Sequence, residues 1–276
     1  MKGLPEDILL LDSALSLVRI ETDVAGGSAV AYTSRDPEKE TENEDTVAII
    51  PYGPGAAALV VADGAGGLPA GKRASLTAVE TLAASLQSAM DKTMLLRTAI
   101  LNGIEAANAA VLGLANGSAT TLTVITIEGL TARSYQIGDS EAIILGQRGV
   151  IKLQTTAHSP TGFAVEAGFL DERAALLHEE RHLVSNFIGT ADMCIDVGAT
   201  VELSPRDTVL LASDGLMDNV HLDEIIEFVR KGSLSDAANS VAELAHRRMH
   251  APRAGQPSKP DDLSVILFRK PGSFDT

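Results

Sequence analysis

Short apolar runs bounded by glycine, proline and acidic residues recur along the chain. Two neighbouring runs, 46–50 and 56–62, are joined by a turn rich in proline and glycine, a pattern that predicts an antiparallel β-hairpin. Antiparallel pairing sets the start of the first strand beside the end of the second. The pattern alone therefore places Glu44, Asp45 and Asp63 close together.

Further apolar, β-branched runs predict a second block of strands and two late ones. A turn at 138–140, which contains Asp139, lies inside the block, so we expect a continuous antiparallel meander with this turn as one of its hairpins. One late strand ends in Asp214-Gly215, and the other is opened by Asp261-Asp262. The predicted strands are 120–128, 131–137, 141–145, 150–153, 207–213 and 263–268.

Four stretches have helical spacing: 68–90 and 93–114 between the strand blocks, and 223–230 and 234–250 late in the chain. Strand blocks with helices in two pairs predict an α+β fold, a four-layer α-β-β-α sandwich of two antiparallel sheets flanked by helix pairs. The chain shows no linker or repeat, so we expect a single domain over 1–276. A polar segment, 157–181, is interpreted as a flap or lid and is expected to carry a helix over 166–178.

Composition narrows the function. The 276 residues are 45% hydrophobic but only 3% aromatic, so the core must consist mainly of Ala, Val, Leu and Ile. The net charge of −15 disfavours nucleic acid and anionic membranes as partners, since both are polyanions. The single cysteine, Cys194, excludes an internal disulfide and a Cys-rich zinc site, and we expect it to be a small buried residue.

The chain start, Met1 to Asp7, lacks the residue order of a signal peptide. The longest apolar stretches fall far short of the roughly 20 residues that a membrane span needs. The expected location is therefore the cytoplasm, and the expected state is a monomer.

Carboxylates gather at the predicted strand ends, and these carry the candidate chemistry. Several of them cannot stay ionised together in a partly buried site without a cation. Mg²⁺ and Mn²⁺ prefer oxygen ligands, and two such ions can activate a water as nucleophile and polarise a phosphoryl oxygen. A lone Asp-Gly pair is more often an ordinary turn than a metal site, since Asp-Gly is a common turn dipeptide, so the prediction depends on the joint pattern. The acids are Glu44, Asp45, Asp63, Asp139, Asp214, Asp261 and Asp262.

Five motifs in order resemble the metal-dependent protein serine/threonine phosphatases of the PPM type, also called type 2C, in their bacterial form. The resemblance runs from about residue 43 to residue 268. The motifs are Asn43-Glu44-Asp45, Val61-Ala62-Asp63-Gly64-Ala65-Gly66-Gly67 with Gly71-Lys72-Arg73-Ala74-Ser75, Ile137-Gly138-Asp139-Ser140, Ala212-Ser213-Asp214-Gly215-Leu216-Met217-Asp218-Asn219-Val220, and Asp261-Asp262-Leu263-Ser264-Val265-Ile266.

The resemblance implies hydrolysis of phosphoserine and phosphothreonine in phosphoproteins, which are the products of serine/threonine kinases, by a metal-activated water. It implies two Mn²⁺ or Mg²⁺ ions and a third, weaker one. By position, Asp63 bridges the two ions, and the other ligands are Gly64 through its carbonyl, Glu44 for the second ion, and Asp214 and Asp261 for the first. Asp45 acts through metal-bound water, and Asp139 binds the third ion. Asp262 contacts the ligands without binding an ion itself. Asp63, Asp214 and Asp45 are the implied catalytic residues.

The chain departs from the family pattern where phosphate is handled. The family usually has an arginine four residues before the motif glutamate, and this position is Glu40. Lys39, Arg35 and Lys72 are the candidates to replace that arginine. Other departures are Ala65 after the Asp-Gly pair, Ala157 within Thr155-Thr156-Ala157-His158, which favours a structural role for His158, and Asn186 before the late glycine element.

Three hypotheses remain open on the sequence: an active phosphoprotein phosphatase, a weakly active or inactive relative that binds phosphoproteins, and a hydrolase of small phosphoesters. The complete acid set favours the first, and Glu40 favours the second.

Overall fold

The computed structural model describes residues 8–12, 17–36, 38–65 and 70–272. The predicted helix start at Leu68 and the motif glycines Gly66 and Gly67 lie outside these residues. Among the described helices, none is long and apolar enough to cross a membrane.

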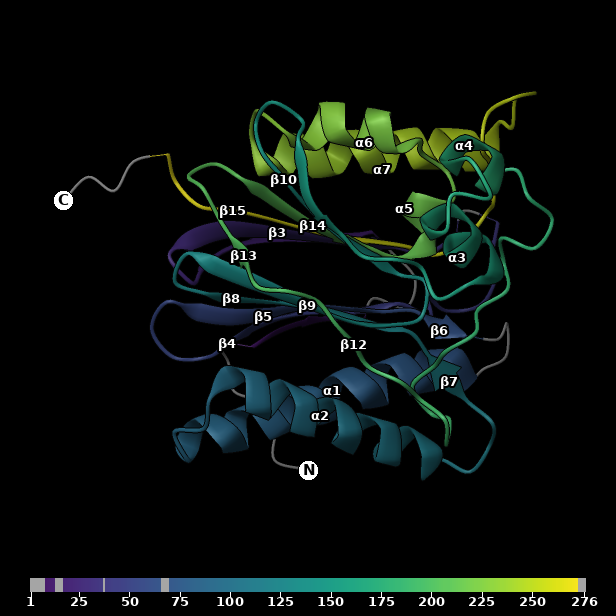
Figure 1. Cartoon of the computed structure of the whole chain (residues 1–276). Coiled ribbons are helices and arrows are strands. Elements are labelled where there is room, and N and C mark those ends of the chain that lie inside the picture. Colours follow the sequence, from purple (N-terminus) through teal and green to yellow (C-terminus); the bar gives the residue numbers. More distant parts are fainter. Residues whose placement is uncertain (1–7, 13–16, 37, 66–69, 273–276) are drawn as a thin grey trace.

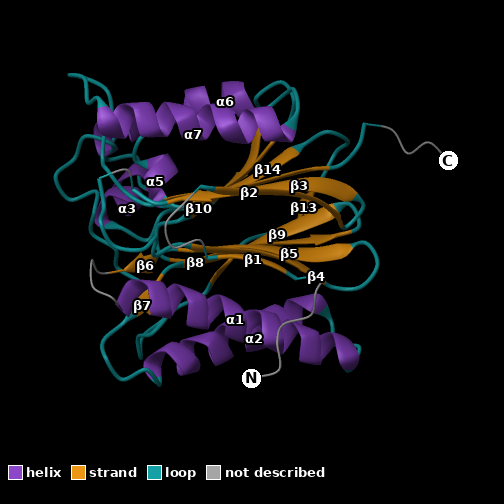
Figure 2. Ribbon diagram, turned by 180° about the vertical axis from the view of Figure 1, so that it is seen from behind, coloured by secondary structure: helices purple, strands orange, loops and turns teal. Residues whose placement is uncertain are grey.

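The described residues form four layers, a helix pair, two antiparallel sheets and a second helix pair (Figure 1). Figure 2 shows the same layers from behind. The predicted α-β-β-α sandwich is confirmed. The first sheet contains, in order, β1 (Leu9–Leu11), β4 (Thr46–Pro51), β5 (Ala56–Ala62), β8 (Leu122–Glu128), β9 (Thr131–Ile137) and β12 (Asp196–Val197), with β13 (Val201–Glu202) also paired to β9.

The second sheet carries the late strands beside the early ones. Its order is β11 (Ile151–Gln154), β10 (Glu141–Leu145), β14 (Thr208–Ala212), β15 (Leu263–Arg269), β3 (Gly27–Ser34) and β2 (Val18–Val24). A short pair, β6 (Gly64–Ala65) with β7 (Ala119–Thr120), lies outside both sheets.

Two long helices cover each sheet. The helices α1 (Ala70–Asp91) and α2 (Leu96–Leu112) cover the first sheet, and α6 (Leu222–Val229) and α7 (Leu234–His250) cover the second (Figure 1). Three shorter helices, α3 (Pro160–Glu166), α4 (Glu172–Ala175) and α5 (Asp214–Met217), lie at the end of the sandwich that also holds β6 and β7 (Figure 1).

The core follows from the two-residue period of the strands. In β5, Leu59 and Val61 face the other sheet, whereas Ala58 and Val60 face the helices. Both faces are therefore apolar. On α1, small and aliphatic residues spaced by four, from Ala74 to Leu86, are buried against the first sheet. Small side chains let helix and sheet approach closely, which explains how a core with few aromatic residues is filled.

The predicted hairpin is confirmed. Strands β4 and β5 pair antiparallel with Thr46 opposite Ala62. Asp45 precedes this pair of residues and Asp63 follows it, so both reach the same edge of the first sheet.

The predicted continuous meander is wrong. Strands β8 and β9 belong to the first sheet, whereas β10 and β11 belong to the second. The 138–140 turn is therefore a crossover between sheets, and it is held at the first sheet by Gln136 Nε2, which donates to Gly138 O at 3.0 Å, and by Thr123 Oγ1, which donates to Ser140 O at 2.7 Å. Because the crossover links β9 in the first sheet to β10 in the second, it carries Asp139 between the two sheets.

The flap helix predicted over 166–178 is also wrong. The segment instead forms α3 and α4, separated by irregular chain. Ser159 Oγ accepts from Gly162 N at 2.9 Å and starts α3, and Asp171 Oδ1 accepts from Arg173 N at 2.9 Å and starts α4. Two local N-caps thus replace one continuous helix.

Candidate metal centre and active site

Acidic residues from both sheets meet at one edge of the sandwich. Asp45 and Asp63 come from the β4–β5 hairpin, and Asp214 and Asp261 flank the paired strands β14 and β15, in which Ala212 lies opposite Val265. Ser213 Oγ donates to Asp45 Oδ2 at 2.8 Å and thereby ties the two sheets together at this edge. The sandwich brings these carboxylates to one place, as the strand-end pattern predicted for Asp45 and Asp63.

Two glycines allow the close approach. A Cβ added to Gly64 would overlap the carbonyl of Gly71 and lie 2.9 Å from Glu44 O, and one added to Gly215 would overlap Asp262 O. The chain at these two positions therefore needs glycine, because any side chain would push the acid-bearing loops apart.

Electrostatics place Asp63 at the centre of the cluster. Burial raises the pKa of its carboxyl well above the usual 3.8, and the charges of Asp45, Asp214, Asp261 and Asp139 raise it further. Four other carboxylates thus lie close enough to Asp63 to oppose its ionisation.

The neighbouring acids also have raised pKa values. Burial, followed by the charge of Asp262, raises the pKa of Asp45 to about 7, although hydrogen bonds from serine hydroxyls oppose the shift. Burial and the charge of Asp214 raise the pKa of Asp261 to about 8, and the same two causes raise the pKa of Asp139. A cluster of this kind gains stability from a cation.

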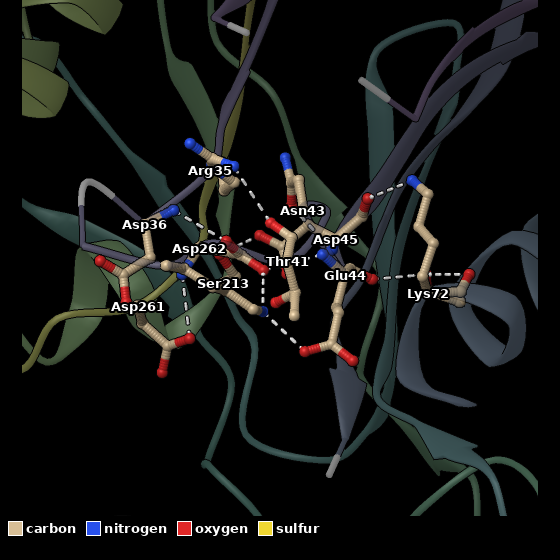
Figure 3. A network of polar contacts seen from close by, with 12 residues as sticks. Arg35, Asp36, Thr41, Asn43, Glu44, Asp45, Lys72, Ser213, Asp261 and Asp262 are labelled. Carbon is tan, nitrogen blue, oxygen red and sulfur yellow. Dashed lines mark hydrogen bonds and ion pairs between the residues drawn. The ribbon is translucent and has the colours of Figure 1, made fainter. Parts of the chain in front are cut away.

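Asp262 holds the loop that carries Glu44 (Figure 3). Its Oδ2 accepts from Glu44 N and from Lys39 Nζ, both at 2.7 Å, and its Oδ1 accepts from Asp36 N at 2.8 Å. Asp262 is 3% exposed; its bond to Glu44 N is buried, and its bonds to Lys39 and Asp36 are partly buried. Its position fits a supporting role next to the metal ligands, and its bonds to Asp36 and Lys39 hold the charged 33–43 segment against the site.

The three candidate phosphate-binding cations lie in different surroundings. Lys39 Nζ bridges Glu44 Oε2 at 2.6 Å and Asp262 Oδ2 at 2.7 Å. Arg35 Nη1 donates to the backbone carbonyls of Glu40 and Thr41 on the exposed side of the loop. Lys72 Nζ donates to the carbonyls of Asp12 and Asp45, and burial lowers its pKa. Of the three, only Lys39 contacts a carboxylate of the cluster through its charged group.

Two residues of the cluster were missed by the sequence reasoning. Lys259 Nζ is hydrogen-bonded to Asp214 Oδ2 and lies 3.2 Å from both Asp218 Oδ2 and Asp261 Oδ2. Asp218 lies one turn after Asp214, and burial and the charge of Asp214 raise its pKa to about 6. A lysine two residues before the motif acid Asp261 was the available signal.

His158 is built into the base of the flap. Its Nδ1 accepts from Gly138 N at 3.2 Å and from Asn186 Nδ2 at 2.9 Å, and its own N donates to Gly138 O at 2.9 Å. These bonds fit the structural role expected for His158. Asn186 also bonds both backbone polar groups of Cys194. The expectation of a buried cysteine is wrong, because this backbone anchoring leaves the Cys194 thiol on the exposed side.

The donor set fits a hard divalent cation. Asp45 Oδ1 and Asp214 Oδ1 are buried without a hydrogen-bond partner among the described residues. In the same described part of the chain, no three acidic, histidine or cysteine side chains already form a coordination shell. The ammonium groups of Lys39 and Lys259 lie among the carboxylates instead. Mg²⁺ and Mn²⁺ prefer oxygen ligands, and a bound cation would offset the repulsion between these carboxylates.

A cavity of about 560 Å³ opens beside the cluster, between the flap, β10, β11 and α6. Asp139, Asp214 and Asp218 are among the residues that line it. Its wall carries further acids, among them Glu141, and apolar side chains such as Met217 and Ile226. A substrate segment can therefore lie next to the carboxylates.

An open-edged cluster of carboxylates between two packed sheets, with a cavity leading to it, defines the class of hydrolases that use oxygen-ligated divalent cations. The sequence of residues 37–251 matches the family described as Protein phosphatase 2C. The chain therefore belongs to that family, as the motifs predicted. The match ends before Asp261, so the closing motif rests on the structure, which brings Asp261 to the same edge.

Known relatives agree with this assignment. A protein of Streptococcus pyogenes described as a phosphatase 2C-type protein is 29% identical over 219 residues, covering 76% of this chain and 88% of the relative. The structure of the serine/threonine phosphatase Stp1 from Staphylococcus aureus superposes with a TM-score of 0.75 at 25% identity and covers 92% of this chain and 98% of its own. The catalytic domain of the phosphatase PstP, solved in complex with two manganese ions, gives a TM-score of 0.68 at 25% identity and covers 92% and 99% of the two chains.

Proposed function

We propose that this chain hydrolyses phosphoserine and phosphothreonine in phosphoproteins at a site for two Mn²⁺ or Mg²⁺ ions. The observation that carries the proposal is the convergence on Asp63 of four other carboxylates from both sheets. Membership of the phosphatase 2C family supports the same reaction.

The ligand set we propose is Asp63 between the two ions, with the Gly64 carbonyl, Glu44, Asp214 and Asp261 around them. When bound, the ions supply an activated water and draw charge from the phosphoryl oxygens. Asp45 is anchored by Ser213, so its unpartnered Oδ1 can orient that water. Asp139 lines the cavity beside the cluster, and its position corresponds to the ligand of the third, weaker ion in the family.

We assign phosphate binding to Lys39. Its ammonium lies between Glu44 and Asp262. Lys39 precedes Glu40, which occupies the sequence position where the family usually has an arginine. Burial works against the charge of Lys39, but its hydrogen bonds to Asp262 and Glu44 outweigh burial and raise its pKa. The cation therefore stays charged and can turn toward a phosphoryl oxygen when Glu44 binds its ion. Arg35 and Lys72 are retained by backbone carbonyls and are the secondary candidates.

The cavity beside Asp139 and Asp214 is the proposed place for the peptide around the phosphorylated residue. A phosphoprotein made by a serine/threonine kinase is the partner that this geometry favours. The expected cytoplasmic location and monomeric state stay predictions.

The test is hydrolysis of p-nitrophenyl phosphate and of a phosphothreonine peptide with Mn²⁺, with Mg²⁺ and with chelator, for the wild type and Asp214→Asn. We expect metal-dependent turnover of the peptide that falls about a hundredfold or more in the variant. Asp192→Asn is the matched control and should keep full activity, because Asp192 is exposed and is not among the residues that line the cavity.

Two other outcomes would overturn the proposal. Phosphopeptide binding without turnover, despite bound metal, would indicate a phosphoprotein-binding relative. Turnover confined to p-nitrophenyl phosphate and other small esters would indicate a small phosphoester hydrolase.

A further inference from the structure

Lys259 places a permanent positive charge inside the acidic cluster. Its Nζ is hydrogen-bonded to Asp214 Oδ2 and lies 3.2 Å from Asp218 Oδ2 and 3.2 Å from Asp261 Oδ2. Its side chain is only 20% exposed, so water screens these contacts poorly. One ammonium thus contacts three carboxylates, of which those of Asp214 and Asp218 also line the cavity.

The position of Lys259 is fixed by its backbone. Its N donates to Asn219 Oδ1 at 2.7 Å, and its carbonyl accepts from Asn219 Nδ2 at 2.8 Å. Asn219 is fully buried, and its amide also donates to Gly215 O at 2.9 Å. Because Asn219 follows Asp214 by five residues, one local framework holds both the lysine and the acids that it contacts. The ammonium is therefore directed into the cluster by a built support.

Two acids near Lys259 are not used by the proposed pair of ions. Asp139 is 7% exposed, and Asp218 is bonded to no other described cation closer than 4.0 Å, the distance from its Oδ2 to Arg181 Nε. Burial raises the pKa of both acids, and the charge of Lys259 lowers it again. The charge of Lys259 thus offsets part of the cost of ionising both carboxylates that remain once two ions are bound.

We propose that the Lys259 ammonium takes the place of the third cation, so that this chain binds two divalent ions rather than three. The inference rests on the proposed function for the two remaining ions. A tethered cation has an effective concentration on the order of millimolar or higher, and it needs no dehydration of a free divalent ion. A weakly held ion cannot displace such a group.

The experiment counts bound Mn²⁺ by isothermal titration calorimetry and by electron paramagnetic resonance of free Mn²⁺, with the full-length chain. We expect two ions on the wild type and three on Lys259→Met, which keeps the length of the side chain and removes its charge. The matched control is Lys152→Met. Lys152 is also partly buried and bonds a buried acid, Asp207, at 2.5 Å, but it lies outside the cluster, and this variant should bind two ions.

Further variants keep the result decisive. Lys259→Gln is the second uncharged variant should Lys259→Met fail to fold, and Lys259→Arg, which retains the charge, should bind two ions. Adding Asp139→Asn to Lys259→Met should remove the third ion.

Three ions on the wild type, or two on both uncharged variants, would overturn the inference. So would two ions held more tightly in those variants, because Lys259 would then compete with one of the proposed pair. The count does not depend on turnover. A wild type that binds two ions and hydrolyses nothing would contradict the proposed function while leaving this inference supported.

Discussion

Ser213 Oγ lies 2.8 Å from Asp45 Oδ2 and joins the end of β14 in one sheet to the residue before β4 in the other. Both residues are fully buried, and Ser213 Oγ also accepts from Ser264 N at 3.0 Å. The bond is therefore one of the links that fix the distance between the two halves of the site.

Replacing Ser213 with alanine should destabilise the chain by about 1–3 kcal/mol, because it leaves buried Asp45 Oδ2 and Ser264 N without their partner. Urea unfolding monitored by circular dichroism measures the loss. Ser28→Ala is the matched control, since Ser28 makes a similar 2.7 Å bond to Asp23 in an exposed position, and we expect a change within about 0.5 kcal/mol. Equal effects of the two substitutions would show that the bond does not tie the sheets.

Asp63→Asn should separate metal binding from folding. Since the charges of four neighbouring acids oppose the ionisation of Asp63, removing its charge should raise the melting temperature of the metal-free protein. The same variant should lose the rise in melting temperature that Mn²⁺ gives the wild type, because an ion that binds only the folded state stabilises it. Differential scanning calorimetry with and without Mn²⁺ measures both effects. A variant that still gains stability from Mn²⁺ would remove Asp63 from the ligand set.

Lys39→Met should raise the KM for a phosphothreonine peptide about ten- to a hundredfold at saturating Mn²⁺, because a hydrogen bond to a charged group contributes about 1.5–3 kcal/mol. Lys39→Arg should recover most of this loss. Lys72→Met, which removes a cation held by backbone carbonyls, is the comparison and should change the KM far less. If the Lys72 variant shows the larger rise, phosphate binding belongs to that residue.

Glu40→Arg restores the residue type that the family usually has at this position, and it should lower the KM for the same peptide. The Arg35 side chain donates from Nη1 to the backbone carbonyl of Glu40. This bond does not involve the Glu40 side chain, so the loop should keep its shape. An unchanged KM would show that Lys39 already supplies the full interaction. Steady-state kinetics on the single variant and on Glu40→Arg combined with Lys39→Met decide between the two.

The sequence was most informative where the physics is local. The β4–β5 hairpin could be predicted because its apolar runs are adjacent and joined by a proline- and glycine-rich turn, and its register then places Asp45 beside Asp63. The crossover at Asp139 could not be predicted, because two apolar strands joined by a short turn look alike whether they stay in one sheet or change sheets. The meeting of Asp63 with Asp214 requires the two predicted sheets to pack together. Only the family motifs indicated that these two acids belong to one site.

The cations were the least predictable part of the site. Lys259 reaches Asp214 across 45 residues of sequence, and its direction depends on the backbone clamp from Asn219. Lys39 lies in a charged segment that has the composition of a solvated loop, yet buried Asp262 draws it inward. Long side chains have no periodicity that reveals their direction, so the charge balance of the site emerges only from the folded structure.

The free energy of unfolding should depend on pH through His158. Burial lowers the pKa of this imidazole below its usual 6.5 and outweighs the charge of Asp196, which raises it. The ring accepts hydrogen bonds at Nδ1 from Gly138 N and Asn186 Nδ2. The unfolded chain therefore binds more protons than the folded one just below pH 6.5. The free energy of unfolding should then fall as the pH is lowered from 6.5 through the depressed pKa of the folded state.

His158→Asn keeps an acceptor near the position of Nδ1 but does not titrate, so its stability should depend less on pH between about 6.5 and 5. Thermal unfolding of wild type and variant at matched ionic strength measures the two slopes. His246→Asn is the useful comparison: burial also lowers the pKa of His246, but its ring bonds Ser34 on the other sheet, away from the Gly138 crossover. Both substitutions should flatten the stability profile, because each removes a buried ring whose pKa is lowered in the folded state. If neither slope changes, proton uptake by these rings does not control the acid stability of the fold.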